Sequence, residues 1–231
     1  MVQRQLSDNL RAVTERVRAA CRRAGRSADE VTLVAVTKTV PAEVAALLPG
    51  LGVLDLGESR PQELWRKAAA LTTAVRWHLI GHLQRNKVER TLPLVHLIHS
   101  VDSARLLAAV EEEAARQGRA VEVLLEVNAS RETQKHGFAP EEVRGLAEQV
   151  IGLRQVRIVG LMTMAALQEN PERCRPTFAA LRELRDRLRG EWGPPHTLHH
   201  LSMGMTNDFE VAVEEGATLV RIGTALFQGC Y

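Results

Sequence analysis

Short apolar runs alternate with helical patterns along most of the chain. The runs lie at residues 31–36, 53–56, 77–80, 95–98, 121–127, 156–161, 198–201 and 218–222. Because they are apolar throughout, they indicate strands buried on both faces, as in a parallel sheet covered by helices. Between them, proline and glycine punctuate helical patterns at residues 41–48, 61–71, 84–91, 103–117, 140–151, 171–189 and 207–215.

This succession predicts an α/β protein, a TIM (β/α)8 barrel that forms a single domain over residues 1–231. A doubly wound open sheet is the alternative. A further amphipathic helix is predicted at residues 7–24, with Ser7 as its cap and Gly25 at its end. Only residues 224–231 follow the last strand, so the N-terminal helix, within residues 1–26, is expected to pack beside that strand and complete the outer ring.

Composition narrows the class of protein. The net charge is +2 and basic residues are scattered among acidic ones, which favours solvated helix faces over nucleic-acid binding. The cysteines, Cys21, Cys174 and Cys230, are widely spaced and form no CxxC pair, so neither a disulfide framework nor a structural zinc site is indicated. The polar N-terminus and the lack of an apolar run of about 18 residues predict a cytoplasmic protein without a membrane span.

Polar residues gather where the predicted strands end, which is where TIM barrels place their sites. Two glycine-containing loops follow the seventh and eighth strands, and they read SMGMT at residues 202–206 and RIGT at residues 221–224. Loops at these positions often bind phosphate through backbone N–H groups. The alternative is that Gly204 and Gly223 only permit tight turns, but the occurrence of both loops together favours a phosphate site.

Lys38 interrupts the apolar run VTLVAVTKTV at the end of the first strand. A lysine in a barrel mouth can form a Schiff base, because partial desolvation lowers its pKa and frees the amine for attack on a carbonyl. An aldehyde that also carries a phosphate would satisfy both Lys38 and the loops, and pyridoxal 5'-phosphate (PLP) is such a molecule. The alternative is that Lys38 is a solvent-facing strand terminator.

The chain resembles the YggS-type pyridoxal phosphate homeostasis proteins, also called the proline synthetase co-transcribed family. The motifs that carry this resemblance span nearly the whole chain: AVTKTVP at 35–41, LGES at 56–59, WHLIGHLQRNK at 77–87, HSVD at 99–102, EVN at 126–128, KHG at 135–137, GLM at 160–162, LSMGMTND at 201–208 and RIGTALF at 221–227. The chain departs from the family pattern at Ser59, where asparagine is usual, at Thr206, where serine is common, and at Gln228, where glycine is common.

The resemblance implies a barrel similar to the N-terminal domain of alanine racemase, with the PLP aldehyde on Lys38 and the phosphate near residues 202–204 and 223–224. It also implies that Arg221 faces the pyridine nitrogen, which keeps that nitrogen unprotonated and the cofactor a weak electron sink. The residues predicted to contact the cofactor are Lys38, Glu58, Ser59, His78, Ser100, Met162, Ser202, Met203, Gly204, Arg221, Gly223 and Thr224.

The same resemblance implies a carrier that serves intracellular PLP homeostasis and delivery, with no established catalytic residue or turnover. The expected partners are PLP and apo forms of PLP-dependent enzymes, and the chain is expected to be a monomer. A racemase of this architecture needs a second proton-transfer group, typically a tyrosine, and the only tyrosine here is Tyr231. A PLP-dependent racemase of low efficiency, an aldolase or another Schiff-base lyase remains the alternative.

A metal hydrolase is a further alternative, because the chain contains several histidines. The candidates are His78, His82, His196, His199 and His200. Barrel hydrolases often place an HxH motif at the end of the first strand, where this chain has Thr37 and Lys38, so no metal is expected. His199 is predicted to lie in the core or just behind the site.

Overall fold

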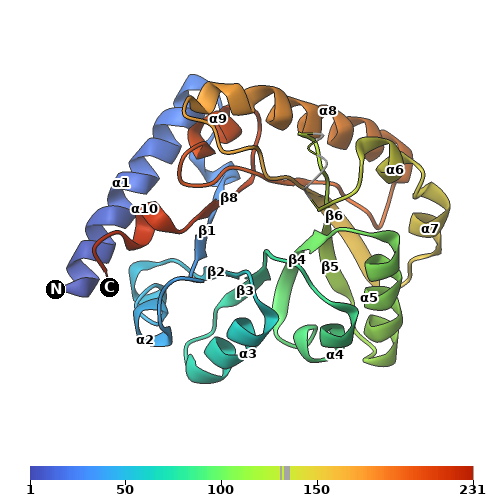
Figure 1. Cartoon of the computed structure of the whole chain (residues 1–231), viewed down its shortest axis with the longest axis horizontal. Coiled ribbons are helices and arrows are strands. Elements are labelled where there is room, and N and C mark those ends of the chain that lie inside the picture. Colours follow the sequence, from blue (N-terminus) through green and yellow to red (C-terminus); the bar gives the residue numbers. More distant parts are fainter. Residues whose placement is uncertain (131, 133–135, 231) are drawn as a thin grey trace.

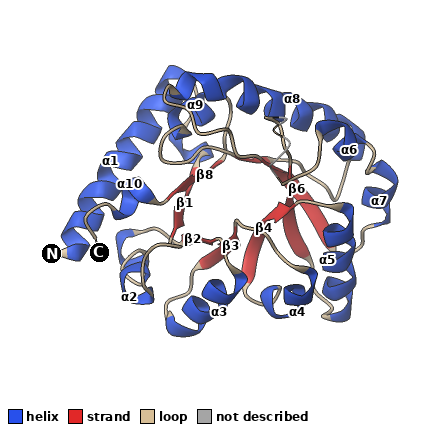
Figure 2. Ribbon diagram, viewed as in Figure 1, coloured by secondary structure: helices blue, strands red, loops and turns tan. Residues whose placement is uncertain are grey.

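The protein is a closed barrel of parallel strands wrapped by helices (Figures 1 and 2). The computed structural model describes residues 1–130, 132 and 136–230. The strands are β1 (Thr32–Val36), β2 (Asp55–Glu58), β3 (Arg76–Leu79), β4 (Val95–Val101), β5 (Val121–Glu126), β6 (Val156–Met162), β7 (His200–Ser202) and β8 (Leu219–Ile222). Parallel pairing of β8 with β1, from Thr32 opposite Leu219 to Ala35 opposite Ile222, closes the barrel. The TIM-barrel prediction is therefore confirmed, and the open sheet is excluded.

Helices follow most strands and cover the outside of the barrel. They are α1 (Val2–Arg23), α2 (Ala42–Ala45), α3 (Pro61–Ala70), α4 (Val88–Thr91), α5 (Ala104–Arg116), α6 (Pro140–Arg144), α7 (Ala147–Gly152), α8 (Arg175–Trp192), α9 (Phe209–Glu214) and α10 (Thr224–Phe227). Short 3₁₀ turns are η1 (Ala28–Glu30), η2 (Pro49–Leu51), η3 (Arg85–Lys87) and η4 (Pro171–Cys174).

Several elements differ from their predicted bounds. The predicted helix at 140–151 is split into α6 and α7 at Gly145, a residue of low helix propensity. The predicted helices at 41–48, 84–91 and 171–189 each include a 3₁₀ turn or adjoin one. The seventh strand begins at His200 rather than Leu198, because Leu198 has a φ of 44° and cannot be part of an extended segment.

Helix α1 completes the outer ring, as predicted, but it begins at Val2 rather than near Ser7. The apolar face extends back to Leu6, which is fully buried, so the helix gains packing by starting earlier. The helix lies against α9 and α10 (Figure 1). The side-chain amide of Asn9 donates hydrogen bonds to the carbonyl oxygens of Leu226 and Gln228, at 3.0 and 2.9 Å.

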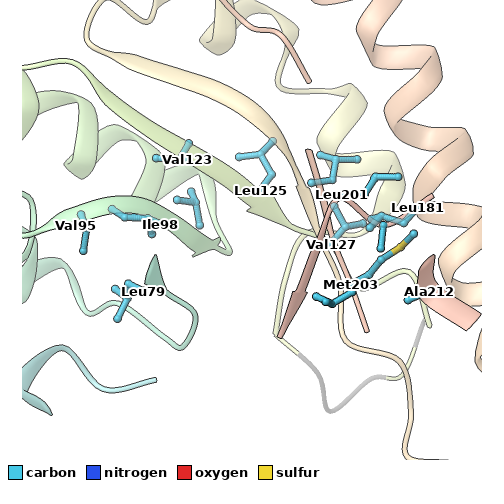
Figure 3. Close-up of a cluster of buried hydrophobic side chains, with 14 of the residues drawn as sticks. Leu79, Val95, Ile98, Val123, Leu125, Val127, Leu181, Leu201, Met203 and Ala212 are labelled. Carbon is cyan, nitrogen blue, oxygen red and sulfur yellow. The ribbon is translucent and has the colours of Figure 1, made fainter. Parts of the chain in front are cut away.

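Two apolar layers stabilise the barrel. The larger layer lies between strands and helices, and Figure 3 shows part of it, with Leu201 of β7 near Leu181 of α8 and Val123 of β5 near Ile98 of β4. The smaller layer fills the barrel interior and comprises Val34, Leu97, Leu124, Val159, Met162 and Leu219. Since side chains alternate along a strand, Val34 and Val36 point inward and Ala35 and Thr37 point outward. The same alternation directs the next side chain, Lys38, into the barrel mouth.

Candidate functional site

A cavity of about 500 Å³ opens at the carboxyl ends of the strands, and we call it the mouth cavity. This volume is within the range of small-molecule sites. Its polar lining residues are Lys38, Thr39, Ser59, Gln168, Thr206, Asn207, Asp208, Arg221 and Thr224, and glycines 81 and 223 also line it. The residues come from loops that are far apart in the sequence, so the closed barrel itself assembles the site.

Lys38 lies two residues beyond the end of β1, and its side chain is exposed at the wall of the mouth cavity. Among the described residues, its ammonium group has no hydrogen-bond or ion-pair partner. An amine in this position is accessible to a ligand in the cavity. Lys38 therefore lies beyond the end of the strand, as a strand terminator would, and also faces the cavity.

A buried ion pair anchors the backbone immediately before Lys38. Lys67 of α3 donates to the carbonyl oxygen of Thr37 at 2.6 Å and to Glu58 Oε1 at 2.5 Å. The hydroxyl of Thr37 donates to the same carboxylate oxygen at 2.7 Å. These three residues are fully or almost fully buried, so the peptide that joins Thr37 to Lys38 is held from the outer side of the barrel.

The phosphate-binding prediction concerns the loops after β7 and β8. Gly223 and Thr224 line the mouth cavity together with Thr206, whose hydroxyl accepts a hydrogen bond from the backbone N–H of Ala225 at 3.3 Å. A Cβ atom on Gly223 would lie 3.2 Å from the carbonyl oxygen of Val36, so the close approach of this turn to β1 favours glycine. Two hydroxyls and a glycine turn thus form a polar end of the cavity that suits an anion.

Arg221 of β8 provides a buried positive charge at the same cavity. Its guanidinium donates to Ser202 Oγ at 2.5 Å and to the carbonyl oxygen of Thr163 at 3.0 Å. Burial lowers the pKa of Arg221 to about 10, although the negative charges of Glu126 and Asp208 oppose that shift. The residue therefore stays positively charged at neutral pH, and it can only donate to a ligand atom.

Five of the predicted cofactor contacts line the mouth cavity: Lys38, Ser59, Arg221, Gly223 and Thr224. The other seven do not line it: two point outward, three lie deeper in the barrel and two are held by structural contacts. Met203 and Glu58 point outward, and Met203 joins the apolar layer of Figure 3. Met162 lies in the interior apolar layer, and Ser202 and His78 lie deeper in the barrel.

The two remaining residues have structural contacts. Gly204 has a φ of 92°, and a Cβ atom there would lie 2.6 Å from the Cβ of Ala212, so the turn and the approach of α9 require glycine. Ser100 donates to the carbonyl oxygen of Gly81 at 2.6 Å. For Gly204, the alternative of a tight turn is the one that its surroundings support.

The predicted cofactor contacts did not include Gly81, Thr206 and Asn207, although all three line the mouth cavity. Thr206 stands two residues after Gly204 in the loop already assigned to phosphate, so its hydroxyl was the available signal. Gly81 is required by contact, because a Cβ atom there would lie 2.2 Å from the carbonyl oxygen of Ser59. Lys135 of the KHG motif and Tyr231 lie outside the described residues.

The histidines considered as metal ligands are dispersed. Across residues 1–130, 132 and 136–230, no group of three or more histidine, cysteine, aspartate or glutamate side chains is arranged to hold a metal ion. His196 accepts from the backbone N–H of Ile158 at 3.1 Å, and His200 contacts the hydroxyl of Thr218 at 3.2 Å. The prediction that His199 lies in the core or just behind the site is wrong: it is exposed, because β7 begins after it.

Comparison with known proteins places this barrel in a class. The family model described as "Alanine racemase, N-terminal domain" matches residues 9–230. An alanine racemase of Clostridium difficile 630 shares the fold, with a TM-score of 0.74 at 16% identity over 95% of this chain and 56% of that one. The barrel fold and the family-model match together show that this protein is an alanine-racemase-type barrel.

Closer relatives narrow the class. A "Pyridoxal phosphate homeostasis protein" of Aquifex aeolicus (strain VF5) is 45% identical over 95% of this chain and 96% of its own length. PipY of Synechococcus elongatus PCC7942, whose structure was solved with PLP bound, has a TM-score of 0.83 at 32% identity and covers 96% of this chain and 99% of its own. The chain belongs to the family of pyridoxal phosphate homeostasis proteins.

Membrane-spanning helices and disulfide bonds were also considered. Within the described residues, we find no helix with the length and apolar character needed to span a membrane. Cys21, Cys174 and Cys230 are all buried, and none of the three is in a disulfide bond.

Proposed function

We propose that this protein binds PLP as a Schiff base on Lys38 and serves PLP homeostasis and delivery. The observation that carries the proposal is that a lysine with no partner among the described residues, a buried arginine and a glycine–threonine turn line one cavity of about 500 Å³. Further support comes from the relative PipY, which was solved with PLP bound. When bound, the cofactor supplies an aldehyde that an amine can attack.

Different cavity residues are proposed to contact different parts of the cofactor. The Lys38 amine is the nucleophile for the aldehyde, and Gly223, Thr224 and Thr206 are the phosphate ligands. Arg221 donates toward the pyridine ring, and because it lacks an acceptor it leaves the ring nitrogen unprotonated. An unprotonated ring withdraws electrons weakly, so these residues favour holding the cofactor over demanding carbanion chemistry.

A carrier role fits the composition of the cavity better than turnover does. No tyrosine lines the described part of the cavity, and racemisation needs a second proton-transfer group opposite the lysine. We propose that the protein acts as a monomer in the cytoplasm and passes PLP to apoenzymes. That the three cysteines form no disulfide bond supports a reducing compartment.

A cofactor titration tests this proposal. PLP added to the purified protein should produce an absorption band at a longer wavelength than the band of free PLP. Lys38→Ala should abolish this band while leaving weaker, phosphate-dependent binding. Lys87→Ala is the matched control, since Lys87 does not line the cavity. An unchanged band in Lys38→Ala would contradict the proposal. Turnover of an amino acid by the loaded protein would favour the racemase or lyase alternative.

A further inference from the structure

A continuous chain of hydrogen bonds crosses the barrel interior below the mouth cavity. It starts at Arg221, which donates to Ser202 Oγ, and Ser202 lies 2.8 Å from His99 Nδ1. His99 Nε2 lies 2.8 Å from His78 Nδ1, and His78 Nε2 lies 2.9 Å from Asp55 Oδ1. The last member, Arg76, binds both oxygens of Asp55 at 2.7 and 2.5 Å.

The chain connects the two ends of the barrel. Asp55 and Arg76 begin β2 and β3, so they lie at the amino-terminal end of the strands, opposite the cavity. The side chain of Arg76 is 49% exposed, whereas His78, His99 and Ser202 are at most 2% exposed. One end therefore meets solvent and the other meets the proposed cofactor.

When both imidazoles are neutral, as their burial favours, the chemistry of the two ends fixes every proton between them. A guanidinium only donates and an ionised carboxylate only accepts. Ser202 must therefore accept from Arg221 and donate to His99 Nδ1. His99 must carry its proton on Nε2 and donate to His78, and His78 must donate from Nε2 to Asp55. Both neutral imidazoles are then Nε2–H tautomers.

The charges around the chain are consistent with neutral imidazoles. Burial lowers the pKa of His99 well below the ordinary value, and the positive charge of Arg221 acts in the same direction. Burial also lowers the pKa of His78, although Asp55 opposes that shift. His96, 5.7 Å from His78 between ring centroids, and His200 are the other titratable groups nearby.

We propose that Asp55, His78, His99 and Ser202 form a positioning chain that orients Arg221 in the mouth cavity. The proposal rests on the proposed function, because it treats Arg221 as the residue that faces the cofactor ring. The Ser202 hydroxyl is then not a phosphate ligand, since its only proton is donated to His99. The state of an ion pair at the far end of the barrel then governs how firmly Arg221 is held.

Nitrogen NMR of the ligand-free protein tests the chain directly. We expect both His78 and His99 to be neutral Nε2–H tautomers at pH 7.5, and the guanidinium protons of Arg221 to exchange slowly. Asp55→Asn keeps the shape but offers an amide that both donates and accepts, so the His78 tautomer should become mixed and exchange at Arg221 should accelerate. His200→Gln is the matched control, because His200 is near the chain but bonds to Thr218 instead.

Cofactor binding supplies the second readout. Asp55→Asn and His99→Leu should each weaken PLP binding about tenfold, as expected for loss of one hydrogen bond to a charged group, whereas His200→Gln should leave it unchanged. A charged or Nδ1–H imidazole in the parent protein would overturn the proposal, as would unaltered Arg221 exchange in both chain variants. If the parent binds no PLP, the proposed function fails, and Arg221 exchange alone decides whether the chain positions the arginine.

Discussion

At the scale of single residues, the site depends on groups that never touch the ligand. Lys67 and Glu58 lie on the outer side of the barrel, yet they fix the peptide from which Lys38 projects. Glu58 Oε2 is buried and has no hydrogen-bond partner among the described residues, so Lys67 is the main compensation for that carboxylate. A buried ion pair of this kind adds little net stability, but removing one partner is costly.

Lys67→Met should therefore destabilise the protein by about 3 to 5 kcal/mol, because it leaves the Glu58 carboxylate unpaired and buried. Urea denaturation measures the free energy of unfolding. The double variant Glu58→Gln, Lys67→Met is the control, and it should recover a substantial part of the loss because no charge is left buried. If the double variant were as unstable as the single one, packing rather than charge would explain the effect.

Gly204 gives a second residue-scale prediction. Gly204→Ala should cost at least about 2 kcal/mol, because the new methyl group would meet Ala212 and the backbone of Phe209 at a positive φ. Gly25→Ala is the matched control: its φ is also positive, at 65°, but nothing lies within 4 Å of the new atom. It should cost only about 1 to 2 kcal/mol. Equal losses would show that conformation alone accounts for Gly204.

At the scale of elements, α1 covers a part of the barrel that the helix after β8 is too short to cover. Helix α10 spans only Thr224–Phe227, and α1 packs on both α9 and α10. Buried residues of α1 are Leu6, Val13, Val17, Ala20 and Cys21. The N-terminal helix is therefore part of the barrel's outer layer.

Leu6→Ala should destabilise the protein by about 2 to 5 kcal/mol, the range for truncating a fully buried leucine. Thermal unfolding followed by circular dichroism measures the change. Val2→Ala, at an exposed position of the same helix, should have little effect. Removal of residues 1–26 should expose apolar surface and cause aggregation, and a soluble, fully folded truncation would contradict this role for α1.

Elements were easier to predict than side-chain directions. Each buried strand has a continuous apolar run in the sequence, so all eight strands and the barrel could be predicted. Whether a residue near a strand end faces the cavity depends on the parity of its position, and a shift of one residue reverses it. This is why Met203 and Glu58 were assigned to a cavity that they do not line. Thr206 lies in the loop beyond β7, where strand alternation gives no direction, and it was not among the predicted cofactor contacts.

At the scale of the whole molecule, buried histidines make stability depend on pH. Burial lowers the pKa of His78, His99, His196 and His200, the last to about 4. A histidine with a depressed folded pKa contributes stability above its unfolded pKa, near 6.5, and this contribution is lost as the pH falls. Each such group contributes at most about 1.4 kcal/mol per pH unit.

The free energy of unfolding should therefore decrease as the pH falls from about 6.5 toward 4, more steeply than for one histidine. Chemical denaturation at a series of pH values measures this slope, and His200→Gln should reduce it.

Glu126 affects stability in the opposite sense, because burial, aided by the charge of Asp102, raises its pKa to about 7. Glu126→Gln should thus stabilise the protein at pH 8 and lose that advantage near pH 4. A flat profile between pH 4 and 6.5 would contradict the histidine assignment.

The most direct test of the central claim is to load the protein with PLP, reduce it with borohydride and locate the modified residue by mass spectrometry. The lysines of the chain are Lys38, Lys67, Lys87 and Lys135. The account predicts one pyridoxyl adduct, on Lys38, because Lys38 alone among the described lysines lines the mouth cavity. An adduct confined to another lysine, or no adduct at all, would contradict it.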